Sequence, residues 1–443
     1  MKLRGFLQFS LNYLEDCNTE TPNYLGFFLW KNLMMNNINK VQINRQISVG
    51  LFLLIIGLFF SSYIASINTS DAAIWLAACA LGFTLQKSRF CFASSFRDLF
   101  LFGSGQNMKG VLIALTVSSI GFIGILNWIL PNPLAGEYPS SAHVLPVGLS
   151  TIVAGVLFGV GMVISGGCIS GTIYRVAEGY VASVITLFGV IIGSILLIIT
   201  WDFWWVNFIS NESKIFLPST YSLGYGMSLL LTLIGLFIIY ILVLFFESKS
   251  GIVEYKIKDI KSQEPENLTD KLKISIHSVF IKSWSIKFGG LSVGFISIVY
   301  FLFHSPPGVT GEIMKQSLTI SKIFNFSDGV LSGIGSLSGC LGSIESSGII
   351  SHTFVSTVGV FFGALISALF SNEFKIRKPK EIKRYYQSLS GGVMMGYSAS
   401  LGIGCTIGAF LSAIPSLSLS GWVFGLSLFF GSFIGTKIIR RLG

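Results

Sequence analysis

Two short stretches, Gly167-Cys168-Ile169-Ser170-Gly171 and Gly404-Cys405-Thr406-Ile407-Gly408, repeat one glycine and cysteine pattern inside apolar sequence. Upstream glycines recur in the same register before both cysteines, at Gly155 and Gly159 and again at Gly392 and Gly396. Glycine permits irregular backbone and close approach, so the duplicated pattern predicts two broken helices in corresponding places. Two breaks that bring thiols to one central site are typical of a secondary transporter.

A less specific interpretation is that small-residue patterns arise often in membrane helices that are rich in glycine. A single Gly-x-x-x-Gly would be consistent with it. A cysteine together with four glycines in matched register on both copies argues against chance, so we favour the duplicated broken helix.

Composition sets the class of protein. The chain has 443 residues, of which 52% are hydrophobic and 11% charged, and its mean hydropathy is +0.73. Soluble domains carry about 25% charged residues. Apolar runs of about 20 residues recur along the chain, which predicts an all-α polytopic membrane protein. The net charge of +10 does not indicate nucleic-acid binding, because the basic residues lie mostly in the expected loops.

The sequence divides into a polar extension (1–45), a first transmembrane half (46–247), a charged linker (248–285) and a second half (286–443). The extension lacks the apolar core and cleavage site of a signal peptide, so we expect a cytoplasmic segment. About ten apolar segments are expected, at 46–67, 72–86, 108–130, 147–166, 180–200, 224–246, 286–304, 349–371, 389–404 and 418–438.

Basic residues indicate the orientation. They cluster in the extension, the linker, the loop 372–387 and the C-terminus, whereas loops 131–146 and 201–223 are nearly free of them. By the positive-inside rule both termini are cytoplasmic. The first Gly-Cys-x-x-Gly then follows a segment that enters the membrane from outside, and the second follows one that enters from inside. This predicts two inverted-topology repeats with the site at the midplane between them.

A third cysteine, Cys91, follows the short segment 72–86. Its counterpart in the second half is ambiguous. One candidate is Ser305–Glu312, which has no cysteine, and the other is the run Ser332–Gly342, which contains Cys340. The core would hold three thiols in the first case and four in the second. We prefer three: Cys91, Cys168 and Cys405.

Three cysteine motifs in order resemble the YeeE/YedE family of sulfur-compound transporters. They are Arg89 to Asp98 (RFCFASSFRD), Ser165 to Gly179 (SGGC followed by YRVAEG) and Gly402 to Cys405 (GIGC). The resemblance covers roughly residues 70–440. It does not clearly extend to the N-terminal extension or to 327–348.

The resemblance implies a bacterial or archaeal inner-membrane protein that imports thiosulfate or a related small sulfur anion. It also implies that the thiols of Cys91, Cys168 and Cys405 line a constriction and pass the ion inward. A cytoplasmic sulfur-carrier protein is a candidate partner. Some relatives are selenium-related, so a selenium compound is an alternative substrate.

The chemistry of the motifs fits this substrate independently. Thiosulfate is a dianion with a soft terminal sulfur, and a neutral thiol is a weak donor that can bind this sulfur without trapping the ion. Burial and a bound dianion both favour the protonated thiol. The flanking glycines allow backbone N–H groups to approach the ion, so we include Gly167, Gly171, Gly404 and Gly408 in the predicted substrate site.

Other polar residues carry less weight. Arg175 and Glu178 have the spacing of an ordinary intrahelical ion pair, or of a pair that holds the broken helix. Lys87, Arg89 and Arg97 flank Cys91 and serve either as membrane anchors or to attract an anion. Cys79 is expected to be a packed side chain, and Cys17 a lone thiol of no importance.

Two further functions stay open as alternatives, a metal-ion transporter and a membrane thiol oxidoreductase. The first would need deprotonated thiols, and the histidines lie outside the cysteine motifs. The second usually needs a Cys-x-x-Cys pair, which the sequence lacks. We therefore expect a transporter rather than an enzyme, with no cofactor, no catalytic residue and no metal site.

Overall fold

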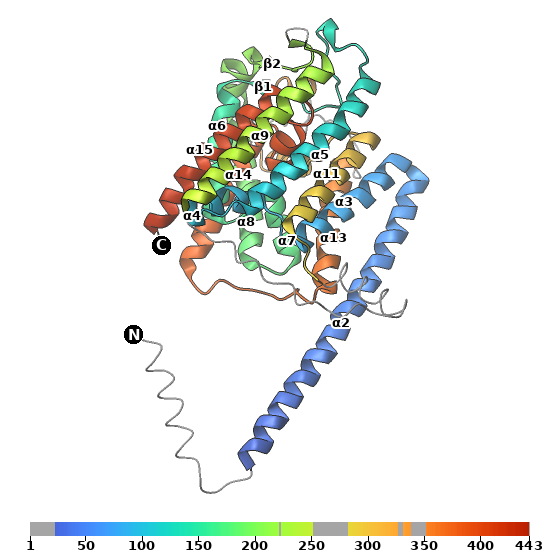
Figure 1. Ribbon diagram of the computed structural model, residues 1–443, viewed down its shortest axis with the longest axis vertical. Coiled ribbons are helices and arrows are strands. Elements are labelled where there is room, and N and C mark those ends of the chain that lie inside the picture. The colour runs from blue at the N-terminus through green and yellow to red at the C-terminus, as the bar shows by residue number, and fades with distance from the viewer. Residues whose placement is uncertain (1–22, 221–222, 251–281, 327–330, 338–350, 443) are drawn as a thin grey trace. The chain divides into compact units, whose positions relative to one another are not determined.

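The computed structural model describes residues 23–220, 223–250, 282–326, 331–337 and 351–442 (Figure 1). Cys17, Cys340 and most of the linker 248–285 lie outside the described residues. Residues 1–49 and 50–443 form two units, and the following paragraphs concern the second. The regular secondary structure of the described residues is helical apart from isolated bridges and one antiparallel pair of two-residue strands, β1 (Pro146–Val147) and β2 (Ser213–Lys214). The predicted all-α class is confirmed.

The described ranges contain ten long helices: α2 (Asn23–Ile67), α3 (Thr69–Lys87), α5 (Gln106–Ile129), α6 (Leu149–Ser165), α8 (Val181–Asn207), α9 (Gly224–Ser250), α11 (Ile286–Phe303), α13 (His352–Phe370), α14 (Ile382–Leu401) and α15 (Leu419–Leu442). Four shorter helices each follow a long helix after a short non-helical interruption: α4 (Phe92–Phe102), α7 (Ile169–Ala177), α12 (Thr310–Ile323) and the π-helix η6 (Thr406–Ser412). Helix α2 crosses the boundary between the two units.

Eight helices among the described residues are long and apolar enough to span a bilayer. The number of candidate spans becomes nine if α14 and η6, which are bent by 48° where they meet, are counted together as one span. The remaining expected segment, 72–86, forms α3, which has 19 residues but is not apolar enough to be counted. Because α3 packs against α13 and α11, much of its surface contacts protein rather than lipid, and polar residues are tolerated there.

Each helix pair formed between the two halves has a counterpart in which the two halves exchange roles. Helix α3 packs on α13 as α11 packs on α5, and α6 packs on α15 as α14 packs on α8. In each pair a glycine of one helix presses against a backbone carbonyl of the other, so closely that a methyl group would clash. The glycine–carbonyl contacts are Gly82 with Val360, Gly290 with Gly110, Gly431 with Val156 and Gly396 with Val190. Such close approach through small residues is how helices associate in lipid.

Corresponding helices run in opposite directions. In α6 and α14, Ala154 lies near Gly402 while Gly161 lies near Gly391, so the two helices are antiparallel. Likewise Ser88 at the end of α3 lies against Gly289 at the start of α11. The Ser70 hydroxyl at the other end of α3 donates to the Phe303 carbonyl. The reciprocal packing and the reversed directions together form the inverted repeat that the sequence predicts.

Candidate functional site

Each of the three predicted cysteines occupies the same local position, as the residue that caps the start of a helix after a break. Cys91 precedes α4, Cys168 precedes α7 and Cys405 precedes η6. Two residues before each cysteine the backbone is left-handed, with φ of 51° at Arg89, 83° at Gly166 and 55° at Ile403.

The left-handed residue ends one helix and lets the chain turn into the next. Glycine adopts this conformation freely, whereas it is uncommon for arginine and an outlier for β-branched isoleucine. The break after α14 is therefore held by its surroundings, in which Ile403 is 3% exposed. The sequence predicted breaks at Cys168 and Cys405 from the glycines. The break before Cys91 has the same geometry without one.

Cys91 and Cys168 come together although 77 positions separate them in the chain (168 minus 91). Their thiols interact directly, and both are buried, with exposures of 3% and 0%. The sulfur of Cys168 also accepts from the Gly171 N–H at 3.4 Å and lies 3.3 Å from the Ser170 hydroxyl. We call Cys91 and Cys168 the paired thiols.

A cavity of about 370 Å³ reaches the paired thiols from one side, with Cys91 in its wall. Three arginines and two glutamates line it together with neutral polar groups: Arg89, Arg175, Arg377, Glu178, Glu373, Ser94, Asn107, Tyr174 and Tyr180, with Ile286. The excess of basic over acidic side chains suits a small anion. Of the three predicted cysteines, Cys91 alone is in this lining.

Two carboxylates in the cavity wall are held by one side chain. Gln86 donates to Glu178 at 3.0 Å and to Glu373 at 2.8 Å, and Glu373 also pairs with Arg89 at 2.8 Å. Burial raises the pKa of Glu178, although the hydrogen bond from Gln86 acts in the opposite direction. The raised pKa and the arginine partner both reduce the negative charge that these carboxylates present to an anion.

Arg175 secures the break between α6 and α7. Its guanidinium donates to the Gly166 carbonyl, and Arg384 donates to the carbonyls of Ile164 at 3.2 Å and Ser165 at 2.8 Å. Two cations thus satisfy the carbonyls at the end of α6 and oppose its dipole. The expected ordinary ion pair between Arg175 and Glu178 is wrong, because the described residues form no such bridge and Arg175 turns back toward α6.

Cys405 lies in the second half and is fully buried. Its thiol lies beside the backbone N–H groups of Ile407, Gly408 and Val309. The Thr310 hydroxyl is also next to it. The segment that reaches Cys405 is therefore Ser305–Glu312, the cysteine-free candidate. Helix α12 begins within this segment, at Thr310, much as α4 begins directly after Cys91. Part of the competing run, 338–342, lies outside the described residues.

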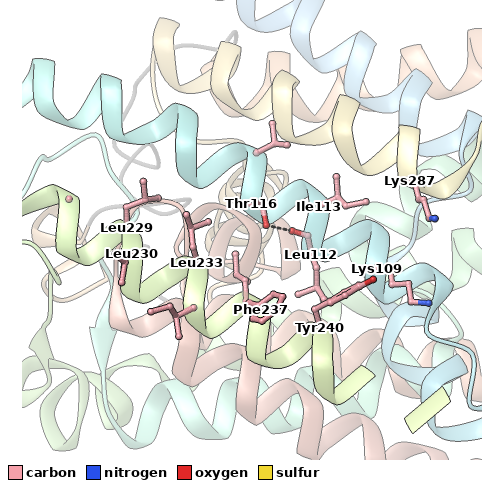
Figure 2. A pocket seen from close by; sticks show the side chains of 14 residues that line it. Lys109, Leu112, Ile113, Thr116, Leu229, Leu230, Leu233, Phe237, Tyr240 and Lys287 are labelled. Atoms are coloured by element: carbon pink, nitrogen blue, oxygen red, sulfur yellow. Dashed lines mark hydrogen bonds between the residues drawn. The ribbon is translucent and has the colours of Figure 1, made fainter. Parts of the chain in front are cut away.

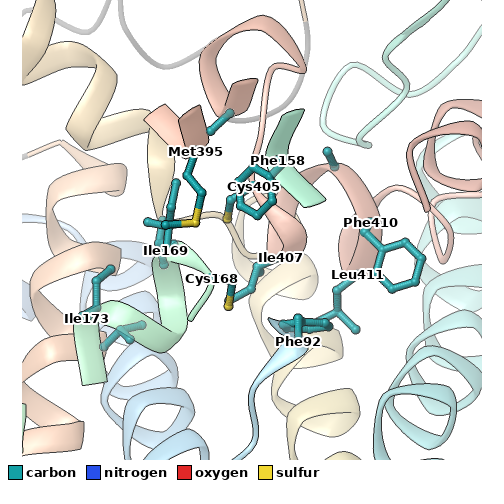
Figure 3. Close-up of a cluster of buried hydrophobic side chains, with 14 of the residues drawn as sticks. Phe92, Phe158, Cys168, Ile169, Ile173, Met395, Cys405, Ile407, Phe410 and Leu411 are labelled. Atoms are coloured by element: carbon teal, nitrogen blue, oxygen red, sulfur yellow. The ribbon is translucent and has the colours of Figure 1, made fainter. Parts of the chain in front are cut away.

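Cys168 and Cys405 belong to one buried cluster (Figure 3). Figure 3 shows the two sulfurs among Met395, Phe158 and Ile407, which come from α14, α6 and η6. Apolar side chains around a thiol exclude water and strengthen any polar contact made there. Cys79 lies in α3, is half-buried and is not in the cavity lining.

Thr310 and Arg175 are the residues that sequence reasoning undervalued. Thr310 lies within Ser305–Glu312, the cysteine-free candidate for the counterpart of Cys91, but nothing in the sequence distinguishes its hydroxyl within that segment. Arg175 was read from its spacing to Glu178, and spacing along one helix does not show that a side chain reaches back across a break.

A larger groove of about 960 Å³ lies between α5, α9 and α11 (Figure 2). Leucines and other apolar side chains line most of it, and Lys109 and Lys287 lie toward one end. Thr116 turns its hydroxyl to the Leu112 carbonyl of its own helix. A hydrated dianion gains little from such a lining, so this groove is a poor candidate for the substrate path.

The described cysteines, Cys79, Cys91, Cys168 and Cys405, are all free thiols. In the described part of the chain, no group of three or more His, Cys, Asp or Glu side chains is arranged to hold a metal ion.

Comparison with known proteins gives one family. The family model described as sulphur transport matches residues 87–434. A thiosulfate transporter of Escherichia coli K12, TsuA, is 25% identical over 348 residues, which is 77% of this chain and 87% of the relative. TsuA of Spirochaeta thermophila is 25% identical over 393 residues, or 83% of this chain and 99% of the relative. A probable transporter of E. coli K12, YedE, is 28% identical over 209 residues, 47% of this chain and 49% of the relative.

Proposed function

Because the chain belongs to the sulphur transport family, we propose that it carries thiosulfate or a related sulfur oxyanion inward across the inner membrane. The ion passes along the neutral thiols of Cys91, Cys168 and Cys405. The named TsuA relatives are thiosulfate transporters that cover most of this chain, which favours thiosulfate. Both termini are cytoplasmic in this proposal, and a cytoplasmic sulfur-carrier protein receives the product.

The observation that carries the proposal is the position of the paired thiols at a cavity rich in arginine. Arg377 and Glu373 of the cavity wall belong to loop 372–387, which is cytoplasmic in this proposal, so the cavity opens toward the cytoplasm. An anion that moves inward from Cys91 therefore leaves past Arg89, Arg175 and Arg377. A thiol in the buried core replaces part of the hydration of the ion, and the basic side chains beyond it attract the ion into the cavity. The thiol binds the soft sulfur weakly, so the ion can leave.

The buried position of Cys405 supports a second step of the same kind. Thiols at two breaks from opposite repeats offer successive weak contacts across the membrane core. Several weak sites conduct better than one strong site, because an ion held by a fixed cation in a dry core would not be released. Gly167, Gly171, Gly404 and Gly408 keep the backbone close to the path.

Uptake of radiolabelled thiosulfate into proteoliposomes tests the proposal, with sulfate and selenite as competitors. We expect uptake that unlabelled thiosulfate suppresses and equal sulfate does not. Preferential suppression by selenite would instead favour the selenium-compound alternative. Liposomes without protein and liposomes with a Cys168→Ala, Cys405→Ala double variant serve as controls. Uptake by the double variant equal to that of the unaltered protein would contradict the thiol path.

A membrane thiol oxidoreductase is the second candidate, because two interacting thiols can form a disulfide. Such an enzyme would change the labelled compound chemically without moving it. Chromatography of the label recovered from inside and from outside the liposomes separates the two functions. Intact thiosulfate inside supports transport, whereas a converted product that stays outside supports the enzyme.

A further inference from the structure

Two buried hydroxyls near Cys405, those of Thr310 and Thr406, have no hydrogen-bond partner among the described residues. Thr310 is 6% exposed and Thr406 is fully buried. Several threonines in these helices donate the hydroxyl to a carbonyl of their own helix, as Thr232 does to Ser228 at 2.9 Å. A buried hydroxyl left without a partner costs stability, so such a group calls for a ligand or another explanation.

Thr310 is the first residue of α12, a helix of 14 residues, and its hydroxyl lies beside the Cys405 thiol. No hydrogen bond of normal geometry ties that hydroxyl to the thiol or to any other described group. The Val309 N–H at the same helix start is also next to the thiol. A free hydroxyl, a thiol and a helix N-terminus thus meet at one buried point, and each favours an anion.

The inverted repeat supplies a parallel. Helix α12 corresponds to α4 and η6 corresponds to α7 in the reciprocal packing of the halves. In the first half Cys91, which precedes α4, meets Cys168. In the second half Thr310, which begins α12, meets Cys405. Thr310, one position after the N-cap residue Val309, is therefore the second-half side chain that meets the Cys405 thiol as Cys91 meets Cys168.

We propose that Thr310 and Cys405 form an anion site in which the Thr310 hydroxyl donates to an oxygen of the substrate while the Cys405 thiol contacts its terminal sulfur. This inference rests on the proposed function and adds a specificity-determining residue to it. A hydroxyl suits the hard oxygens of a sulfonate group, and a thiol suits a soft sulfur. The pair selects an anion that carries both, against sulfate, which lacks the soft sulfur.

The test compares Thr310→Val, Thr310→Ser and the control Thr232→Val in thiosulfate uptake by proteoliposomes. Valine keeps the shape of threonine and removes the hydroxyl. We expect Thr310→Val to raise the KM at least tenfold, which is about 1.4 kcal/mol, as for one hydrogen bond to a charged group. Thr310→Ser keeps the hydroxyl and retains a KM near that of the unaltered protein, and Thr232→Val does not change uptake.

Thermal unfolding of the same proteins separates a binding role from a structural one. Because the hydroxyl has no partner, Thr310→Val should keep or raise the Tm in the absence of substrate, whereas loss of a structural group would lower it. Thiosulfate should raise the Tm of the unaltered protein and of Thr310→Ser, and raise that of Thr310→Val much less.

The outcomes separate failure of the Thr310–Cys405 site from failure of the proposed transport of thiosulfate. If the unaltered protein takes up thiosulfate and Thr310→Val has the same KM, the Thr310 site is wrong and the transport function stands. Equal loss in Thr310→Ser and Thr310→Val, or a lower Tm of Thr310→Val without substrate, also overturns the site. If the unaltered protein takes up no thiosulfate, the proposed function itself fails.

Discussion

The backbone of Gly171 lies against the sulfur of Cys91: a methyl group at Gly171 would be 3.0 Å from Cys91 Sγ. The same methyl group would lie 3.3 Å from the sulfur of Cys168. Carbon and sulfur atoms rarely approach so closely without a shift of one of them. The absence of a side chain at Gly171 thus leaves the space in which the two sulfurs of the paired thiols lie close to each other.

Gly171→Ala should displace the paired thiols and reduce thiosulfate uptake about tenfold or more, because a shift of a few tenths of an ångström disturbs a closely fitted site. Stability should change little, since alanine favours the helix by about 1 kcal/mol and offsets the crowding. Proteoliposome uptake and Tm measure the two effects.

Gly124→Ala is the matched control. Gly124 is also in a helix, and a methyl group there would meet no atom within 4 Å. We expect unchanged uptake and an equal or higher Tm. The same loss of uptake in both variants would show that the site does not depend on the space at Gly171.

Single substitutions Cys91→Ala, Cys168→Ala and Cys405→Ala should each reduce uptake about tenfold or more, because each removes one donor to a charged substrate. Cys79→Ala should have little effect, since Cys79 lies outside the cavity lining. Circular dichroism and Tm check that the variants fold. A fully active, folded Cys168→Ala, Cys405→Ala protein would contradict a thiol path.

Arg175 and Arg384 cap the same helix end, but only Arg175 lines the cavity. Arg175→Gln should therefore raise the KM for thiosulfate, by about tenfold, because the cavity loses one of its cations. Arg384→Gln should leave the KM near its original value and cost about 1–2 kcal/mol of stability through lost bonds to backbone carbonyls. Equal changes of KM in both variants would assign Arg175 a capping role alone.

His143 should make the protein sensitive to acid. Burial lowers the pKa of His143 to about 4, and its Nδ1 lies 3.0 Å from the Gly408 carbonyl. In the unfolded chain the pKa is about 6.5, so the unfolded state binds a proton first as the pH falls. The stability that neutral His143 contributes is present above pH 6.5 and is lost progressively toward pH 4, by up to about 3 kcal/mol.

His143→Asn should flatten the decline of Tm between pH 6.5 and pH 4 while it lowers the Tm at neutral pH. Differential scanning calorimetry at several pH values measures both. Parallel Tm curves for the variant and the unaltered protein would exclude His143 as the source of the acid sensitivity.

Broken helices could be predicted from the sequence because glycine and cysteine are informative locally. A Gly-Cys-x-x-Gly inside an apolar run indicates both where a helix ends and which side chain starts the next. The break at Cys91 was harder to predict, because the sequence around Cys91 contains no Gly-Cys-x-x-Gly pattern. Its detection depended on the short preceding segment and on the family resemblance.

Charge and hydropathy along the chain determined the class of protein, the approximate spans and the inverted order of the repeats. These are properties of segments, and lipid imposes them on any chain that crosses it. The family followed as well, because three cysteine motifs in order are specific enough to recognise.

Only the tertiary structure decided which groups meet. Cys91 contacts Cys168, Thr310 lies beside Cys405, and Arg175 reaches back to Gly166. Each contact depends on how helices from distant parts of the chain cross. Those crossings are set by close glycine contacts such as Gly82 with Val360, which no periodicity along one segment records.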